Sequence, residues 1–85
     1  MKSYQHEQLA RVLSIVEYIG LENDCFAFAN LTVVRGNMRL MIEIGDADGD
    51  CEEIGFSELT EANLDAALAW TLTKQQELFR KGYIA

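Results

Sequence analysis

Carboxylates recur at every second position in one short stretch of the sequence, DADGDCEEIGFSEL, which spans residues 46–59. Carboxylate oxygens arranged around a turn are ligands that calcium prefers in proteins. The same acids on an ordinary β-turn would instead form a solvated negative surface. The choice between a metal site and an acidic turn depends on the elements that flank this stretch.

The opening of the stretch resembles the calcium-binding loop of the EF-hand family. Asp46, Asp48 and Asp50 stand at the first, third and fifth positions of such a loop, and Glu58 stands close to its final Glu. Cys51 occupies the position where the loop needs a Gly, and Glu58 comes one residue late. The preceding sequence, MRLMIEIG, alternates like a strand where the family has a helix. We therefore predict an acidic hairpin turn, with calcium binding by Asp46, Asp48, Asp50 and Glu58 as the alternative.

The N-terminal segment has the periodicity of a helix from residue 3 to residue 19. Its apolar residues follow helical spacing and predict one buried stripe, which comprises Leu9, Val12, Leu13, Val16 and Ile19. Gly20 followed by Leu21 predicts that the helix ends in a Schellman cap, in which Leu21 makes a hydrophobic contact.

From residue 25 to residue 44 the apolar period changes to two, which predicts a β-hairpin. A two-residue turn at Gly36 and Asn37 places Leu31 opposite Ile42 and makes one face of the pair entirely apolar. The same register leaves Phe28 on the opposite face.

A third strand follows the acidic stretch. A three-residue loop of Asp48, Gly49 and Asp50 places Ile44 opposite Ile54, whereas a two-residue loop would place Ile44 opposite a Glu. The hydrophobic register therefore favours the three-residue loop.

A second helix is predicted from an N-cap at Thr60 to about Arg80. Leu59 and Leu64 have the spacing of a hydrophobic staple around this N-terminus. The predicted buried stripe comprises Leu64, Leu68, Thr71, Leu72, Leu78 and Phe79.

These elements predict one α+β domain over residues 1–85. It is a two-layer sandwich of helix, three-stranded antiparallel meander and helix (αβββα), with both helices on the apolar face of the sheet. The order of elements resembles that of double-stranded RNA-binding domains, which hold phosphates with a Lys cluster at the start of their second helix. The matching stretch here, TEANLDAALAW, contains no cation. We therefore expect the resemblance to be limited to topology.

The charge distribution bears most directly on function. The net charge is −7, nine of the fourteen acids fall within residues 43–65, and no Lys or Arg occurs between Arg39 and Lys74. Such a region repels nucleic-acid phosphates and attracts basic protein surfaces. We predict a protein-interaction module, without direct nucleic-acid binding, that docks this region on a basic surface of a partner protein. The predicted partner-binding residues are Glu43, Asp46, Asp48, Asp50, Glu52, Glu53, Glu58, Glu61, Asp65 and Trp70.

Trp70 has two interpretations. It lies away from the predicted buried stripe of its helix, so it could be an apolar anchor for a partner. It could equally pack at the rim of the sandwich. The sequence leaves both interpretations open.

Catalysis is not indicated by the sequence. The chain has one His, no Ser or Cys placed beside it by a known motif, and no Gly-rich phosphate loop. We expect neither an enzyme nor a cofactor. Cys25 and Cys51 are too few for a disulfide framework and predict reduced thiols in the cytoplasm. No apolar stretch reaches the length of a membrane span, so we expect no membrane association.

A structural or oligomerising subunit is a further alternative. The chain could form a homodimer through the outer face of its sheet or through an edge strand. In size and charge it is similar to small acidic proteins of phages and mobile elements. That class often inhibits larger proteins by occupying their nucleic-acid sites, and the resemblance implies an inhibitory role.

Overall fold

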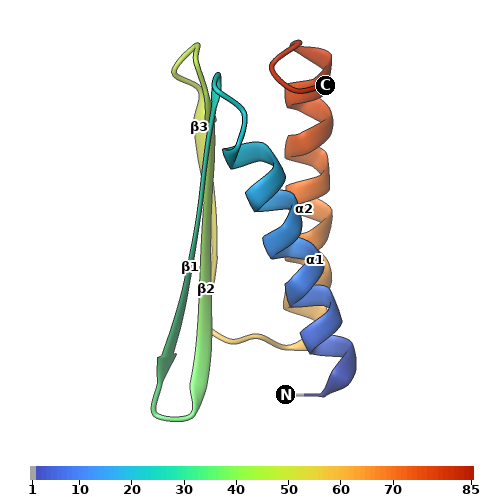
Figure 1. Ribbon diagram of the computed structural model, residues 1–85. Helices are drawn as coiled ribbons and strands as arrows, with labels where there is room; N and C mark the ends of the chain where they lie inside the picture. The colour runs from blue at the N-terminus through green and yellow to red at the C-terminus, as the bar shows by residue number, and fades with distance from the viewer. Residues whose placement is uncertain (1) are drawn as a thin grey trace.

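The computed structural model describes residues 2–85 and contains two helices and one three-stranded sheet (Figure 1). The elements are α1 (Ser3–Gly20), β1 (Cys25–Val34), β2 (Asn37–Asp46), β3 (Cys51–Phe56) and α2 (Glu61–Arg80). The strands are antiparallel in the order β1-β2-β3, so β2 is central. Both helices lie on the same face of the sheet, as Figure 1 shows. The predicted αβββα arrangement of the α+β class is confirmed.

The hydrophobic core lies between the sheet and the two helices. Side chains alternate between the two faces of a strand, and those of β2 that face the helices are almost fully buried. The buried hydrophobic residues are Leu9, Val12, Val16 and Ile19 of α1, Leu40, Ile42 and Ile44 of β2, Leu64, Ala67 and Leu78 of α2, and Leu59 and Ile84 beside them. The predicted apolar face of the sheet is therefore the face that packs on the helices.

The β1–β2 turn lies one residue earlier than predicted. It consists of Arg35 and Gly36, and Leu31 consequently pairs with Leu40 instead of Ile42. Arg35 and Gly36 have φ of 52° and 77°. Two left-handed residues form a type I′ turn, whose twist matches that of the flanking strands. The register error is two residues, so every side chain stays on its predicted face.

The β2–β3 loop has the predicted length of three residues, but it consists of residues 47–49. Asp46 and Asp50 close it, and the Asp46 N–H donates to the Asp50 carbonyl at 2.9 Å. Gly49 supplies the left-handed residue, with φ of 87°. Ile54 consequently pairs with Ile42, which is again two residues from the predicted partner.

The Schellman cap lies at the end of α2 and not, as predicted, at the end of α1. The Schellman cap predicted at Gly20 is wrong, because Gly20 is still part of α1 and does not have the positive φ that the cap requires. Leu21, the residue predicted to make the hydrophobic contact of the cap, is 77% exposed. The motif occurs instead at the end of α2. There Gly82 has φ of 83°, and the Tyr83 N–H donates to the Leu78 carbonyl at 3.0 Å.

The predicted buried stripe of α2 is partly wrong. The N-cap is confirmed, because the Thr60 hydroxyl accepts a hydrogen bond from the Asn63 N–H at 3.1 Å. Leu72 and Phe79, however, are 40% and 62% exposed. The helix instead turns Ala67 into the core, because a small side chain allows the helix to approach its neighbours closely. A stripe defined by large apolar residues alone does not detect this rotation.

Candidate functional site

The predicted acidic region does not fold into one surface. Its acids lie in four places: the β2–β3 turn, the edge of β3 that faces α2, the start of α2 with the loop before it, and the sheet face away from the helices. Each place has its own electrostatic surroundings, so the acids differ in how far they are free to bind a partner.

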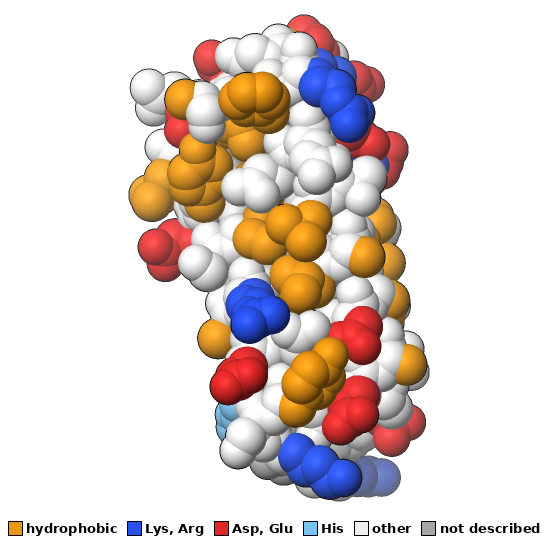
Figure 2. Space-filling view, turned by 90° about the vertical axis from the view of Figure 1, so that its right-hand side faces the viewer, with side chains coloured by type: hydrophobic (Ala, Val, Ile, Leu, Met, Phe, Trp, Pro, Cys, Tyr) orange, Lys and Arg blue, Asp and Glu red, His pale blue; other side chains and the backbone are white. Residues whose placement is uncertain are grey.

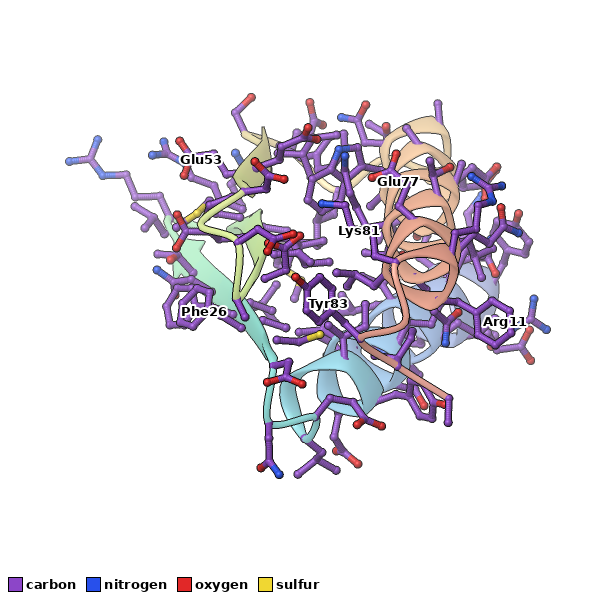
Figure 3. The ribbon with its side chains drawn as sticks, turned by 90° about the horizontal axis from the view of Figure 1, so that it is seen from above. Arg11, Phe26, Glu53, Glu77, Lys81 and Tyr83 are labelled. Atoms are coloured by element: carbon purple, nitrogen blue, oxygen red, sulfur yellow. The ribbon has the colours of Figure 1, made fainter. Side chains whose placement is uncertain are left out.

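The first group is the acidic turn, which we define as Asp46, Asp48 and Asp50. One carboxylate oxygen from each lies within 4.8 Å of the others. The Lys81 ammonium at the end of α2 binds two of them, at 2.8 Å from Asp46 Oδ2 and 2.9 Å from Asp50 Oδ2 (Figure 3). The Asp48 N–H donates to Asp46 Oδ1 at 2.9 Å. Protein groups therefore already bind this cluster.

Lys81 also affects the titration of Asp46. Its hydrogen bond holds the pKa of Asp46 below the usual range, and the Asp46 side chain is only 4% exposed. Hydrogen bonding to Asp48 raises the pKa of Tyr83 to about 12, because a phenolate beside a carboxylate is unfavourable. Lys81, directly after α2, thus neutralises part of the acidic turn, and sequence reasoning missed this contact. The available signal was the position of Lys81 in the cationic end of the helix.

The four ligands of the alternative calcium site do not come together. Glu58 lies at the opposite end of β3, where it lines a hollow with Gly36 and Asn37. The strand between it and the acidic turn has six residues, which span about 20 Å. The flanking elements are two strands, where an EF-hand has two helices.

We expect the wild-type protein to bind calcium no better than magnesium, because the Lys81 ammonium already occupies the position between Asp46 and Asp50. Calorimetric titration with each cation at physiological ionic strength measures this directly. The Lys81→Ala variant serves as the comparison, since it frees the carboxylates of Asp46 and Asp50 from the ammonium and should bind calcium more tightly than the wild type does. Calcium-selective heat from the wild type would contradict the expectation.

The second group is the ion pair between Glu52 on β3 and Lys74 on α2. Lys74 also pairs with Glu77 at 3.3 Å. Its ammonium lies 5.6 Å from the centroid of the Trp70 ring, within cation–π range. Trp70 is half-buried and packs against the core, so it occupies the rim position.

The third group lies at the start of α2. Asp65 Oδ1 accepts hydrogen bonds from the Tyr4 hydroxyl at 2.7 Å and from Gln8 Nε2 at 2.8 Å. These bonds lower the pKa of Asp65 and join α2 to α1. Glu61 lies in the first turn of α2, where its negative charge interacts favourably with the positive end of the helix dipole. Glu58 lies in the loop before it.

The fourth group lies on the sheet face away from the helices, which we call the outer face. Phe28, Glu43 and Glu53 form one row across the three strands, because Glu43 pairs with both of the others. Phe26 lies in the next row and is 51% exposed, and Phe28 is 44% exposed. Figure 3 shows Phe26 and Glu53 on this side of the sheet.

The Glu43–Glu53 pair has an unusual electrostatic setting. Like charges directly opposite each other on neighbouring strands destabilise a sheet. In the four ion pairs within residues 2–85 the cation is always Lys74 or Lys81, and the acid is never Glu43 or Glu53. A local conflict that the fold leaves uncompensated is typical of a functional surface.

The two thiols offer no obvious nucleophile. Burial, followed by the Glu43 carboxylate, raises the pKa of Cys51, and burial, followed by Glu22, raises that of Cys25. Both cysteines are free. The thiolate is the reactive form of cysteine, so these surroundings disfavour covalent chemistry.

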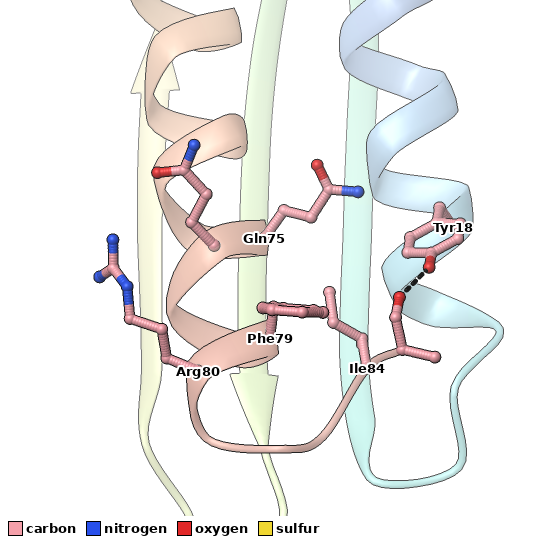
Figure 4. A pocket seen from close by; sticks show the side chains of 7 residues that line it. Tyr18, Gln75, Phe79, Arg80 and Ile84 are labelled. Atoms are coloured by element: carbon pink, nitrogen blue, oxygen red, sulfur yellow. Dashed lines mark hydrogen bonds between the residues drawn. The ribbon is translucent and has the colours of Figure 1, made fainter.

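Two hollows on the helical layer contain none of the predicted site residues. One, of about 340 Å³, is lined by Tyr18, Gln75, Gln76, Phe79, Arg80, Ile84 and Ala85 (Figure 4). The other is lined by Arg11, Ser14, Ile15, Leu68 and Leu72. Figure 2 shows hydrophobic side chains scattered among charged ones over this layer. No His, Asp, Glu or Cys side chain lines either of these two hollows.

Neither helix within residues 2–85 combines the length and the hydropathy needed to cross a membrane. Comparison with known proteins finds no protein family, no curated protein and no solved structure that matches this chain.

Proposed function

We propose that the protein is a non-enzymatic interaction module that binds a basic surface of a partner protein through the outer face of its sheet. The observation that carries the proposal is the uncompensated Glu43–Glu53 pair beside Phe28. Two adjacent carboxylates with no internal cation form a site of negative potential, and the neighbouring rings supply apolar contact area.

A Lys or Arg side chain fits both parts of this surface. Its cationic head would lie between the carboxylates of Glu43 and Glu53, and its aliphatic stem would pack on the ring of Phe28. Arg is the better fit, because its planar guanidinium can donate to two carboxylates and stack on an aromatic face. Such a contact would also relieve the repulsion between the two glutamates.

The remaining acids attract the partner as it approaches and contribute less to direct contacts with it. Asp46 and Asp50 already bind Lys81 at the end of α2, and Glu52 binds Lys74 within it. With a net charge of −7, the protein still attracts basic surfaces over distances of about 8–10 Å at physiological salt. Association with the partner should therefore slow as salt is added.

The proposal includes two finer statements about role and place. Docking on a basic surface that normally holds nucleic acid would make the protein an inhibitor, which is the role implied by its resemblance to small acidic proteins of phages and mobile elements. Competition between DNA and the protein for the purified partner tests this role. Two free cysteines support a reducing compartment such as the cytoplasm.

Nuclear magnetic resonance of the ¹⁵N-labelled protein, titrated with a Lys/Arg-rich peptide, locates the binding surface. We expect the amide shifts to change most at Phe26, Phe28, Glu43 and Glu53. Changes centred on Asp48 and Glu61 instead, at opposite ends of the molecule, would show general attraction to negative charge and would contradict the proposal.

A further inference from the structure

Exposed apolar side chains are concentrated on one strand. Within residues 2–85, ten large hydrophobic residues are exposed, and five of them lie on β1: Phe26, Phe28, Leu31, Val33 and Val34. The strand sequence CFAFANLTVV contains no charge and no Pro over ten residues. A quarter of the residues of the chain are charged, so this strand stands out as an uncharged strip.

β1 is also an edge of the sheet, because it pairs only with β2. The lower part of the strand stands clear of both helices in Figure 1, in agreement with the 65% exposure of Val33. Its outer edge carries a row of backbone N–H and C=O groups that no strand within residues 2–85 pairs with. Soluble proteins usually protect such an edge with charges, Pro or a bulge, and this edge has none of the three over its length.

We propose that a second copy of the chain pairs with this edge, β1 against β1 in antiparallel orientation, with Asn30 opposite Asn30 of the second copy. Side chains that face each other across an antiparallel pair lie on the same face of the sheet. Even-numbered residues of one copy must therefore pair with even-numbered residues of the other, and odd with odd. Centring on Asn30 satisfies this condition and uses almost the whole strand. The product is a continuous six-stranded sheet with all four helices on one side.

The charges at the two ends of β1 favour a second copy in this orientation. Glu22 and Asp24 precede the strand, and Arg35 follows it. In the antiparallel pair, Arg35 of each copy lies beside Cys25 and next to Asp24 of the other, so opposite charges meet at both ends. A parallel pair would place like charges together. The uncharged strip between the ends is where two copies with a net charge of −7 can meet with least repulsion.

The side chains are also complementary in size. On the helix side of the sheet, the half-buried Ala27 and Ala29 of one copy would lie opposite the exposed Val33 and Leu31 of the other. On the outer face, Phe28 would lie opposite Thr32 and Phe26 opposite Val34. Pairs of aromatic and β-branched side chains are favourable across strands.

The edge of β1 is long enough for a contact along most of the molecule. Ten residues at about 3.3 Å each span about 33 Å. The longest extent of the molecule is 39 Å, so the contact would run along most of it. All five exposed hydrophobic residues on β1 would face a side chain of the other copy, which is Ala27, Ala29, Thr32, Phe26 or Val34.

This inference does not depend on the proposed function. The dimer rests on the edge of β1 and is measured by molar mass, whereas the proposed function rests on Glu43 and Glu53 and is measured by peptide binding. The first test is the molar mass from sedimentation equilibrium over a concentration series. We expect the wild type to reach twice the 9.6 kDa of one chain. Leu31→Lys should reduce the mass to that of one chain, because it places two ammonium groups close together at the pairing edge.

Leu72→Lys is a matched control, since Leu31 and Leu72 are the same residue type and are both 40% exposed. We expect this variant on α2 to remain a dimer. A wild type that stays at one chain mass, or a Leu31→Lys variant that remains a dimer, would overturn the inference.

A cysteine cross-link tests the register independently of any loss of folding. Hydrogen-bonded and non-hydrogen-bonded pairs alternate along an antiparallel ladder, and the pair that closes a two-residue turn, here Val34 with Asn37, is hydrogen-bonded. Asn30 is four residues before Val34, so it also belongs to a hydrogen-bonded pair. Its backbone N–H and C=O groups therefore point toward β2. At the outer edge it occupies a non-hydrogen-bonded position, where facing Cα atoms are about 4.5 Å apart and a disulfide can form.

In a background with Cys25→Ala and Cys51→Ser, we expect Asn30→Cys to form a covalent dimer under copper–phenanthroline oxidation. Thr32→Cys in the same background should stay reduced, because Thr32 faces Phe28 of the other copy. Cross-linking of Thr32→Cys without cross-linking of Asn30→Cys would overturn the inference.

Discussion

Replacing Leu64 with Ala is expected to lower the free energy of unfolding by about 2–5 kcal/mol. Leu64 is fully buried between α2, the sheet and α1, so the substitution loses the burial of three carbons and leaves a cavity. A small domain typically has only about 5–15 kcal/mol of stability in total. Leu64→Ala should therefore remove a large part of the stability of the fold.

Leu72→Ala is the control, because sequence periodicity places both residues on the same buried stripe. The structure separates them, since Leu72 is 40% exposed. We expect this variant to lose less than about 1 kcal/mol. Urea denaturation followed by circular dichroism measures both, and equal losses would contradict the rotation of α2 described above.

Replacing Gly82 with Ala should lower the stability by about 1–2 kcal/mol, which is the cost of holding an L-residue in the left-handed conformation. Gly82 has φ of 83°, and a Cβ placed there would have no atom within 4 Å. The cost is therefore a backbone cost, without a steric clash. The Schellman cap, the position of Tyr83 and the burial of Ile84 all depend on this conformation.

Gly20→Ala should have the opposite sign and raise the stability by up to about 1 kcal/mol, because Ala is a better helix former than Gly. A Cβ at Gly20 would lie 3.5 Å from the Cβ and the carbonyl oxygen of Ala27, which is ordinary contact. Thermal and urea denaturation of the two variants tests the pair. A loss at Gly20 with no loss at Gly82 would contradict the positions of the two helix ends.

The elements and their faces follow from periodicity, whereas the register does not. The alternation of Leu40, Ile42 and Ile44 identifies the central strand and its buried face. A shift of two residues preserves that alternation, so the hydrophobic pattern does not distinguish the two registers. The difference came from the turn, where Arg35 adopts a left-handed conformation that its residue type disfavours.

The candidate site shows the same limit of sequence reasoning. The predicted registers place Glu43 beside Asn30 and Gly55, whereas the structure places it between Phe28 and Glu53. The abundance of acids could be predicted, but the uncompensated pair beside an aromatic ring could not. The lysines that bind acids of the sheet also lie far along the chain from them, since Lys74 comes 22 residues after Glu52 and Lys81 comes 35 residues after Asp46.

We propose that a basic partner binds the outer face specifically and is not merely attracted by the net negative charge of the protein. The most direct measurement compares two double variants that remove the same charge, Glu43→Gln with Glu53→Gln and Glu58→Gln with Glu61→Gln. Calorimetric titration with a Lys/Arg-rich peptide gives the affinity of each. The first variant should also be at least as stable as the wild type, since it removes a like-charge pair.

We predict that the outer-face variant binds the peptide about five- to tenfold more weakly than the control variant, as expected for the loss of two exposed charge contacts. Equal affinities for the two variants would contradict the account, because they would show that the peptide senses only the total negative charge.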